Sequence, residues 1–478
     1  MFPWAELGSV TDLAGGRRIG GARLAERVAA RAARLRGLGV APGDCVLLVT
    51  ADPLEFIKEM LAGWVAGACV AAVDHTVTPP EFATLVEFVA PTVVLADDVR
   101  EDAPGVKRIV LGGTEPPAVD APPAIDAGPG GAALILFTSG TTGDPKGVLH
   151  TFGSLGARLA LNRAHIAAPA LRRGLCVLPL HFGHGLIGNV LTPLSAGGDV
   201  FILPRPGVPG AARMGQLVGE HGITMISAPP AFWRMALRMS APPPAGTLRH
   251  VGIGSAPVSR DLMEEVARWG GTRNVWNMYG ITETANWVAG HSLASGTAAD
   301  GLVGTMWGGE AGLRQVDGAI SLSGAGEIAL RTPSMMAGYF RRDDLTAQAL
   351  VDGWYLTGDS GTVDDGGLIR LTGRIKDEIN RAGMKIAPAE IDLLLQRHAA
   401  VAEACAFAVP DSVAGEIVGV AVVLEADQRT DERELREWCS RMIRRECVPE
   451  RWFIVDAIPK TERGKVNRRR VREACLKV

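Results

Sequence analysis

The feature that most constrains this chain is the string TSGTTGDPKG at residues 138–147, which is rich in glycine and in hydroxyl side chains. It directly follows residues 134–137, an apolar run with the length of a buried strand. Glycine lets backbone N–H groups approach an anion, the hydroxyls add donors, and Lys146 adds a positive charge. We therefore predict a strand that leads into a polyphosphate-binding loop.

This loop differs from the Walker A motif, another phosphate-binding loop. In that motif the lysine precedes a serine or threonine that holds Mg²⁺, whereas here Lys146 precedes Gly147. A flexible structural turn is the alternative interpretation, and so many donors beside one lysine argue against it. The predicted phosphate-binding residues of the loop are Thr138, Ser139, Gly140, Thr141, Thr142, Gly143 and Lys146.

Helical and strand patterns alternate along most of the chain. Leu24, Val28 and Leu35 share one face of a predicted helix. Apolar runs of strand length follow at residues 45–49, 69–73, 93–96, 108–111, 134–137 and 176–178. This alternation is typical of parallel sheets whose faces are covered by helices.

The character of the sequence changes after Gly373, where arginine and glutamate become more frequent. Strand-like runs at residues 405–409 and 418–424 precede a charged helical stretch at residues 431–445. We therefore predict an α/β protein with two domains. They are a large N-terminal domain of α/β subdomains with mostly parallel sheets, residues 1–375, and a small mobile C-terminal α+β domain, residues 376–478.

Composition narrows the classes of partner. The net charge of -3 and the isoelectric point near 6.3 give no basic surplus that would favour nucleic acid or anionic lipid. The seven cysteines include no C-x-x-C pair, so neither a disulfide framework nor a zinc site is indicated. No apolar run approaches the roughly 20 residues of a membrane span. We expect a cytoplasmic protein with no nucleic-acid or membrane partner.

Four further strings follow the loop at residues 138–147. They are YGITE at residues 279–283, YLTGD at 355–359, GRIKD at 373–377 and PKTERGK at 459–465. This ordered set resembles the adenylate-forming, or AMP-binding, superfamily of acyl- and aryl-CoA synthetases, stand-alone adenylation domains and luciferases. The family loop TSGTTGxPKG is matched in full.

The resemblance implies a role for each motif. It implies that Tyr279 stacks beside adenine, that Thr282 contacts the α-phosphate and that Glu283 helps to hold Mg²⁺. It also implies that Asp359 binds both ribose hydroxyls and that Arg374 lies near the same ribose. The chemistry agrees, because a carboxylate is a hard oxygen ligand for Mg²⁺ and an acceptor for two hydroxyl donors.

The resemblance extends the nucleotide site to further residues. The ATP-binding set implied by it also includes Gly254, Ser255, Ala256, Pro257, Asn277 and Gly280. A plain strand-to-turn segment is the alternative interpretation of residues 254–257. Lys465 resembles the catalytic lysine that reaches the carboxylate and α-phosphate oxygens, where negative charge accumulates during adenylation. A solvated lysine in a basic tail is the alternative for Lys465.

The C-terminal domain of the family rotates between two half-reactions. Lys376 occupies the hinge position, and Gly383 with Met384 occupies the loop that lines the thiol tunnel. Ala382 stands where two consecutive glycines are usual, so this backbone is predicted to be less permissive.

The resemblance places the acid pocket around residues 178–185, 227–233, 252–255 and 276–287. Its predicted members are His181, Phe182, His184, Trp233, Gly252 and Trp276. Amino-acid-activating relatives carry an aspartate near the Phe182 position, so an α-amino acid is not expected. The two histidines either bind a polar group of the acid or serve as packing and as a tunnel gate. The tryptophans, with Trp287, favour an aromatic or compact unsaturated acid.

These observations lead to one reaction and one alternative. The expected enzyme is an acid–thiol ligase that uses ATP and Mg²⁺, forms acyl-AMP and pyrophosphate, and transfers the acyl group of a small carboxylic acid to coenzyme A. The alternative acceptor is the phosphopantetheine thiol of an acyl carrier protein. A luciferase-like oxygenase is not required by any feature, and retention of Lys465, Glu283 and Asp359 disfavours a non-catalytic nucleotide-binding module.

Overall fold

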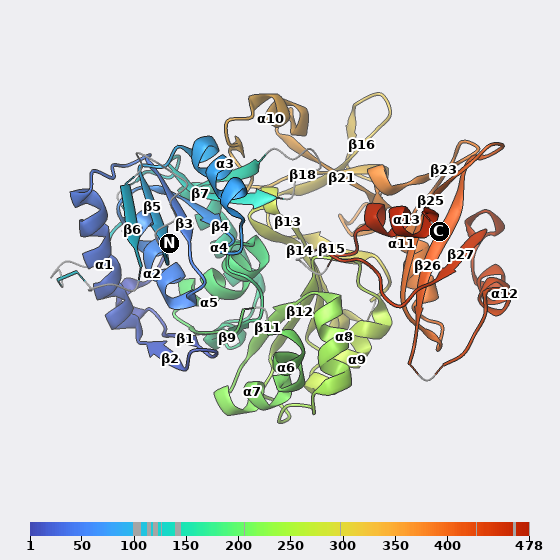
Figure 1. Ribbon diagram of the computed structural model, residues 1–478, viewed down its shortest axis with the longest axis horizontal. Coiled ribbons are helices and arrows are strands. Elements are labelled where there is room, and N and C mark those ends of the chain that lie inside the picture. The colour runs from blue at the N-terminus through green and yellow to red at the C-terminus, as the bar shows by residue number, and fades with distance from the viewer. Residues whose placement is uncertain are drawn as a thin grey trace.

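In the computed structural model of this 478-residue chain, the described residues form three sheets with helices packed around them (Figure 1). The described residues are 1–98, 107–111, 116–117, 123–125, 127–138, 145–204, 206–296, 298–426, 428–461 and 465–477. The predicted loop residues 139–143 therefore lie outside the described part of the chain. None of the helices that the described residues form is long and apolar enough to cross a membrane.

One sheet is built mainly from the N-terminal third of the chain. Its order is β19 (Gly338–Tyr339), β8 (Lys146–Thr151), β7 (Ala132–Thr138), β4 (Cys69–Val73), β3 (Cys45–Val49), β5 (Val93–Ala96) and β6 (Lys107–Val110). Strands β7, β4, β3, β5 and β6 run parallel, whereas β8 and β19 are antiparallel additions. The helices of this region are α1 (Gly21–Gly37), α2 (Pro53–Val65), α3 (Pro79–Val89) and α4 (Phe152–His165).

The largest sheet crosses the middle of the molecule (Figure 1). Its order is β17 (Ile320–Ser321), β16 (Glu310–Arg314), β18 (Gly324–Arg331), β21 (Trp354–Val363), β22 (Ile369–Arg374), β15 (Leu302–Met306), β14 (Asn286–Ser292), β13 (Val275–Ile281), β12 (His250–Gly254), β11 (Met225–Ala228), β9 (Arg173–Cys176), β10 (Asp199–Ile202), β1 (Val10–Asp12) and β2 (Arg17–Ile19). Strands β13 to β10 in this order are parallel, and most of the remainder is antiparallel.

Helices cover the parallel part of this sheet. They include α5 (Thr192–Ser195), α6 (Gly207–Ala212), α7 (Met214–His221), α8 (Pro230–Met239) and α9 (Arg260–Gly270), and α10 (Asp343–Ala349) follows β19 in the chain. The α/β class predicted from the alternation is confirmed, with sheets that are mixed.

The third sheet forms the C-terminal end of the molecule (Figure 1). It contains β24 (Met384–Ile386), β23 (Ile379–Arg381), β26 (Gly415–Leu424), β25 (Val401–Asp411) and β27 (Arg451–Ile454), with α11 (Pro388–Leu395), α12 (Glu432–Met442) and α13 (Arg468–Leu476). The chain passes from the largest sheet to this one between β22 and β23, and the domain boundary after residue 375 stays a prediction.

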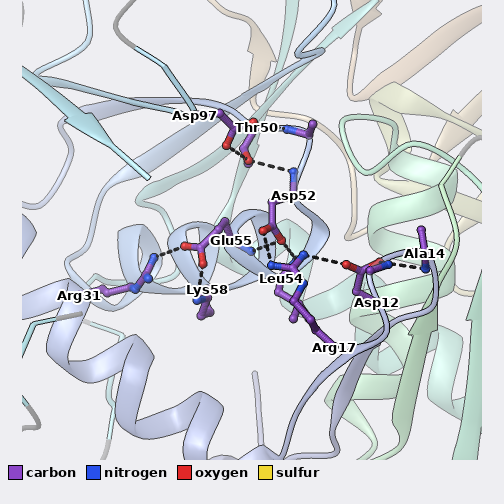
Figure 2. A network of polar contacts seen from close by, with 12 residues as sticks. Asp12, Ala14, Arg17, Arg31, Thr50, Asp52, Leu54, Glu55, Lys58 and Asp97 are labelled. Carbon is purple, nitrogen blue, oxygen red and sulfur yellow. Dashed lines mark hydrogen bonds and ion pairs between the residues drawn. The ribbon is translucent and has the colours of Figure 1, made fainter. Parts of the chain in front are cut away.

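A polar network fixes the large sheet to the N-terminal sheet (Figure 2). Arg17 on β2 pairs with Asp12 and with Asp52, both at 2.7 Å. Asp52 also caps α2, because its carboxylate accepts the N–H groups at the start of that helix. Within the α1–α2 contact, Arg31 binds the buried Glu55 at 2.6 Å. Strand β7, which leads into the predicted phosphate-binding loop, belongs to the sheet anchored in this way.

Candidate active site

A cleft of about 1440 Å³ lies between the large sheet and the C-terminal domain. Motifs that are far apart in the sequence meet in it. The predicted site residues that line it are Thr138, Lys146, Phe182, His184, Ser255, Ala256, Pro257, Asn277, Tyr279, Gly280, Thr282, Glu283, Asp359, Arg374, Lys376 and Lys465. The cleft therefore joins the predicted ATP, acid and catalytic groups in one space.

The predicted ribose-binding group is held by two neighbouring strands and by β13. Asp359 on β21 is the register partner of Arg374 on β22, and Arg374 donates to its carboxylate at 2.6 Å. Tyr279 donates its hydroxyl to the other carboxylate oxygen, also at 2.6 Å. Burial, together with Asp359, raises the pKa of Tyr279 well above its ordinary value, so the phenol remains a donor. Carboxylate oxygens have spare lone pairs, so Asp359 can still accept hydroxyl donors of a ligand.

Two glycines are required by close backbone approach around β13. A Cβ at Gly254 would lie 2.6 Å from the carbonyl oxygen of Met278, and one at Gly280 would lie 2.3 Å from that of Asn286. Asn277 is fixed by a 2.8 Å hydrogen bond from its amide to the carbonyl of Leu302. The floor of the predicted nucleotide site is therefore formed by tightly packed backbone.

The predicted phosphate and metal residues face each other across a short gap. Lys146 begins β8, and its ammonium nitrogen lies 3.9 Å from a carboxylate oxygen of Glu283. Burial lowers the pKa of Lys146, and the charge of Glu283 opposes that shift. A residue that the motifs did not reveal, Tyr339, donates its hydroxyl to Glu283 at 2.8 Å.

The turn that carries Thr282 and Glu283 is fixed by a buried histidine. The Nε2 of His150 lies 2.8 Å from the carbonyl oxygen of Thr282, and because a carbonyl only accepts, Nε2 carries the proton. Burial lowers the pKa of His150 to about 4, which keeps the ring neutral. The left-handed backbone at Ala285 and Asn286, with φ of 57° and 107°, then turns the chain into β14.

The predicted acid pocket contains a hydrogen-bonded row of three side chains. The two ring nitrogens of His184 lie 2.8 Å from the hydroxyls of Ser255 and Ser227. Burial and the positive charge of Lys465 lower the pKa of His184 to about 3. The ring of Trp287 meets His184 edge-on, with centroids 5.5 Å apart. His184 is thus a neutral, oriented part of the cleft wall.

Other predicted pocket residues lie behind this wall. His181 points to Asp74, 3.4 Å away, and its ring packs edge-on against Phe182. Trp233 is fully buried and donates its indole N–H to the carbonyl of Gly252 at 3.1 Å.

A Cβ at Gly252 would lie 2.4 Å from the hydroxyl oxygen of Ser227, so glycine is needed there. Trp276 stacks on His250. The described residues that line the cleft do not include His181, Trp233, Gly252 or Trp276.

The residues predicted for the two half-reactions occupy different places. Lys465 lines the cleft beside the bridge between Lys460 and Val466. Lys376 lies in the short 3-10 helix Ile375–Asp377 between the two domains. Gly383 lies at the exposed tip of the β23–β24 hairpin and Met384 is the exposed first residue of β24, and the described cleft lining includes neither of them.

The chemistry of the described residues fits Mg²⁺ held largely by substrate. No cluster of three or more His, Cys, Asp or Glu side chains suited to a metal occurs among them. Glu283, oriented by Tyr339, is one carboxylate beside the predicted phosphate site. Mg²⁺ is commonly bound by one or two carboxylates together with nucleotide phosphates, so this arrangement is suitable.

Comparison with known proteins identifies the family. The AMP-binding enzyme family matches residues 6–340, and the AMP-binding enzyme C-terminal domain matches residues 390–465. An oxalate–CoA ligase of Arabidopsis thaliana is 30% identical over 95% of this chain and 93% of that protein. A fatty acid–[acyl-carrier-protein] ligase, ScoC, of Streptomyces coeruleorubidus is 31% identical over 92% of this chain and 88% of that protein.

Comparison with solved structures supports the same family. ATP-bound MatB from Rhodopseudomonas palustris superposes with a TM-score of 0.88 at 26% identity, covering 98% of this chain and 95% of that one. The chain belongs to the AMP-binding enzyme family. It is an AMP-forming acid–CoA ligase that acts through an acyl-adenylate, and it binds ATP.

Sequence reasoning missed two residues beside the site, Tyr339 and His150, which lie outside both the motifs and the predicted pocket ranges. Ser227 and Asn286 fall inside the predicted pocket ranges 227–233 and 276–287, although neither was named as a member. A histidine inside an apolar strand was a usable signal for His150, because a buried imidazole needs a partner. Nothing local marks Tyr339, since its role depends on which strands become neighbours.

Proposed function

We propose that this enzyme activates a compact carboxylic acid at the described cleft and transfers the acyl group to coenzyme A. The observation that supports this most strongly is the meeting of Asp359, Arg374, Lys146, Glu283 and Lys465 around one cleft. Asp359 with Arg374 is complementary to ribose hydroxyls, and Lys146 is complementary to phosphate oxygens. Glu283 is complementary to a divalent cation, and Lys465 to the reacting carboxylate.

The reaction has two steps. A carboxylate oxygen of the acid attacks the α-phosphorus of ATP, and the bond to pyrophosphate breaks. The sulfur of the thiol then attacks the acyl carbon of acyl-AMP, AMP leaves, and the thiol proton is released. In the first step Lys465 would neutralise the charge that builds between two approaching anions, and Arg374 with Asp359 would hold the ribose. Mg²⁺ held at Glu283 would neutralise phosphate charge.

The polarity of the acid pocket favours an acid with a hydrogen-bond acceptor. Ser227 is fully buried. Among the described residues, the hydrogen-bond acceptor for the Ser227 hydroxyl is His184. If Ser227 donates to Nε2, then Nδ1 carries the proton and donates to Ser255, whose own hydroxyl proton remains available to the cleft. The neighbouring Trp287 and Phe182 suit a flat, compact group.

A screen of carboxylic acids tests this proposal. Pyrophosphate release is measured for short dicarboxylic, aromatic and hydroxylated aromatic acids and for long-chain fatty acids, first without and then with coenzyme A. Oxalate is included because a relative is an oxalate–CoA ligase. We expect a compact acid with an acceptor group to rank first, and a preference for long alkyl chains would refute the proposed acid class.

The acceptor is tested in the same assay. Because ScoC is an acyl-carrier-protein ligase, a phosphopantetheinylated carrier protein is supplied in place of coenzyme A. We expect faster thioester formation with coenzyme A. Faster loading of the carrier protein would identify that protein as the acceptor.

A further inference from the structure

Tyr339 lies between the two charged groups predicted to handle the phosphates and the cation. Its ring centroid is 3.9 Å from the ammonium nitrogen of Lys146. Its hydroxyl oxygen is 2.8 Å from a carboxylate oxygen of Glu283. Tyr339 is 4% exposed and the Glu283 side chain 11% exposed, so their hydrogen bond is shielded from bulk water, whereas the Lys146 side chain remains 31% exposed.

The strand that carries Tyr339 is attached directly to the strand that carries Lys146. β19 pairs antiparallel with β8, with Tyr339 opposite Val148. The N–H groups of Ala337 and Phe340 donate to β8 carbonyls at 2.8 Å on either side. The position of Tyr339 relative to Lys146 is therefore fixed by backbone pairing and does not depend on side-chain packing alone.

These contacts keep the positive charge of Lys146 apart from the negative charge of Glu283. A lysine has a flexible stem, and its ammonium group would otherwise approach Glu283 closely and neutralise it. The aromatic face attracts the ammonium group, and the hydroxyl occupies one carboxylate oxygen with a neutral donor. The two charges consequently remain 3.9 Å apart, at the outer limit of an ion pair.

We propose that Tyr339 is a positioning residue that keeps Lys146 and Glu283 separate and correctly oriented for magnesium–ATP. The ring acts on Lys146, and the hydroxyl acts on Glu283. This inference rests on the proposed function of those two residues. A second phenol, that of Tyr355 on β21, lies 3.2 Å from the Tyr339 hydroxyl and helps to fix it.

Two substitutions separate the two actions. Tyr339→Phe keeps the ring and removes the hydroxyl, so we expect ATP affinity without Mg²⁺ to remain and the Mg²⁺ concentration for half-maximal tightening to rise several-fold. Tyr339→Leu removes both, so we expect ATP affinity without Mg²⁺ to fall as well, by roughly 2- to 30-fold. Isothermal titration calorimetry of the purified full chain with ATP, in EDTA and across a Mg²⁺ series, gives both quantities without turnover.

Phe340→Leu is the matched control. Phe340 is the next residue, and its ring packs on Phe88, with centroids 5.7 Å apart. This variant perturbs the same segment of chain without touching Lys146 or Glu283, so we expect unchanged ATP and Mg²⁺ affinities. Equal losses in Phe340→Leu and Tyr339→Leu would show that strand packing is responsible and would overturn the inference.

The remaining outcomes are also decisive. Lys146→Ala is measured in parallel, and unchanged ATP binding in that variant would refute the proposed function of the lysine itself. Weakened binding in Lys146→Ala with normal binding in Tyr339→Leu would refute only the inference about Tyr339. If the leucine variant does not fold, Tyr339→Phe decides, because an unchanged Mg²⁺ requirement contradicts the proposal.

Discussion

Replacing Lys465 by alanine should separate the two half-reactions. In this structure Lys465 lines the cleft, and its charge reaches His184 in the acid pocket. This is the position expected of a cation that meets the carboxylate and the α-phosphate during adenylation. Loss of one such electrostatic contact costs about 3 to 4 kcal/mol in the transition state, so acyl-AMP formation should slow by roughly 10²- to 10³-fold.

The hinge variant should have the opposite effect. Lys376 lies in a right-handed 3-10 helix whose φ is close to the value that proline imposes. A hydrogen bond elsewhere between the large sheet region and the C-terminal domain stabilises the observed arrangement, since Arg234 donates to Gln396 at 2.5 Å. Lys376→Pro should therefore keep adenylation and slow transfer to the thiol, because rotation requires new backbone angles at this position.

Each half-reaction is timed separately. Purified variants receive either acid with ATP, read as pyrophosphate, or synthetic acyl-AMP with coenzyme A, read as thioester. Lys376→Ala is the control, since it removes the same charge without fixing φ. If Lys465→Ala and Lys376→Pro lose both half-reactions equally, alternation between two arrangements is wrong for this chain. Normal adenylation in Lys465→Ala would remove the lysine from the catalytic residues.

Three further predictions concern single groups. Lys146→Ala should raise the KM for ATP more than the KM for the acid, and steady-state kinetics with each substrate varied will measure both. His184→Phe should change the ranking of acids in the pyrophosphate screen, whereas His181→Phe should leave the ranking intact, because only His184 lines the cleft. Stability should decrease as the pH falls below about 6.5, since burial lowers the pKa of His150 and His250 to about 4 and that of His184 to about 3. The unfolded chain then binds protons that the folded chain excludes, at about 2 kcal/mol per histidine at pH 5, and equal denaturant midpoints at pH 7 and pH 5 would contradict this.

Local patterns in the sequence were sufficient to predict most strands of the N-terminal sheet. The runs at residues 45–49, 69–73 and 93–96 match β3, β4 and β5, because fully buried parallel strands are continuous apolar runs. The run at 176–178 was placed too late, since β9 spans Arg173–Cys176 and its polar first residue hid the start. The charged helix predicted at 431–445 is α12, which is shorter at both ends.

The sequence predicted those site residues that belong to the recognised motifs. Asp359 and Arg374 belong to two motifs and prove to be register partners on neighbouring strands. The contact of Ser227 on β11 with His184 depends instead on the packing of that strand against the helix His184–Leu191, which no local pattern encodes. The role of Tyr339 likewise arises because β19 returns to β8 from a distant part of the chain. Such residues become visible only when strand order is known.

The β23–β24 hairpin, which we predict to line the thiol tunnel, contains one departure from the family pattern, Ala382. Ala382 and Gly383 form its two-residue tip between Arg381 and Met384, with φ of 49° and 88°. Two successive positive φ values are typical of a type I′ turn, which favours glycine at both positions. Ala382 therefore adopts a left-handed conformation that costs alanine about 1 kcal/mol. This agrees with the less permissive backbone that we predicted from an alanine at a position where glycine is usual.

Replacing Ala382 by glycine should relieve this strain, although greater freedom of the unfolded chain offsets part of the gain. We expect a rise of at most about 1 kcal/mol in the free energy of unfolding, with adenylation unchanged and thioester formation from supplied acyl-AMP faster. Gly383→Ala is the matched opposite. No described atom lies within 4 Å of the added Cβ, so its effect comes from backbone strain alone and should lower stability and slow the thiol step. If both variants leave the thiol half-reaction unchanged while stability shifts in the expected directions, the hairpin tip is strained but lies outside the path of the thiol.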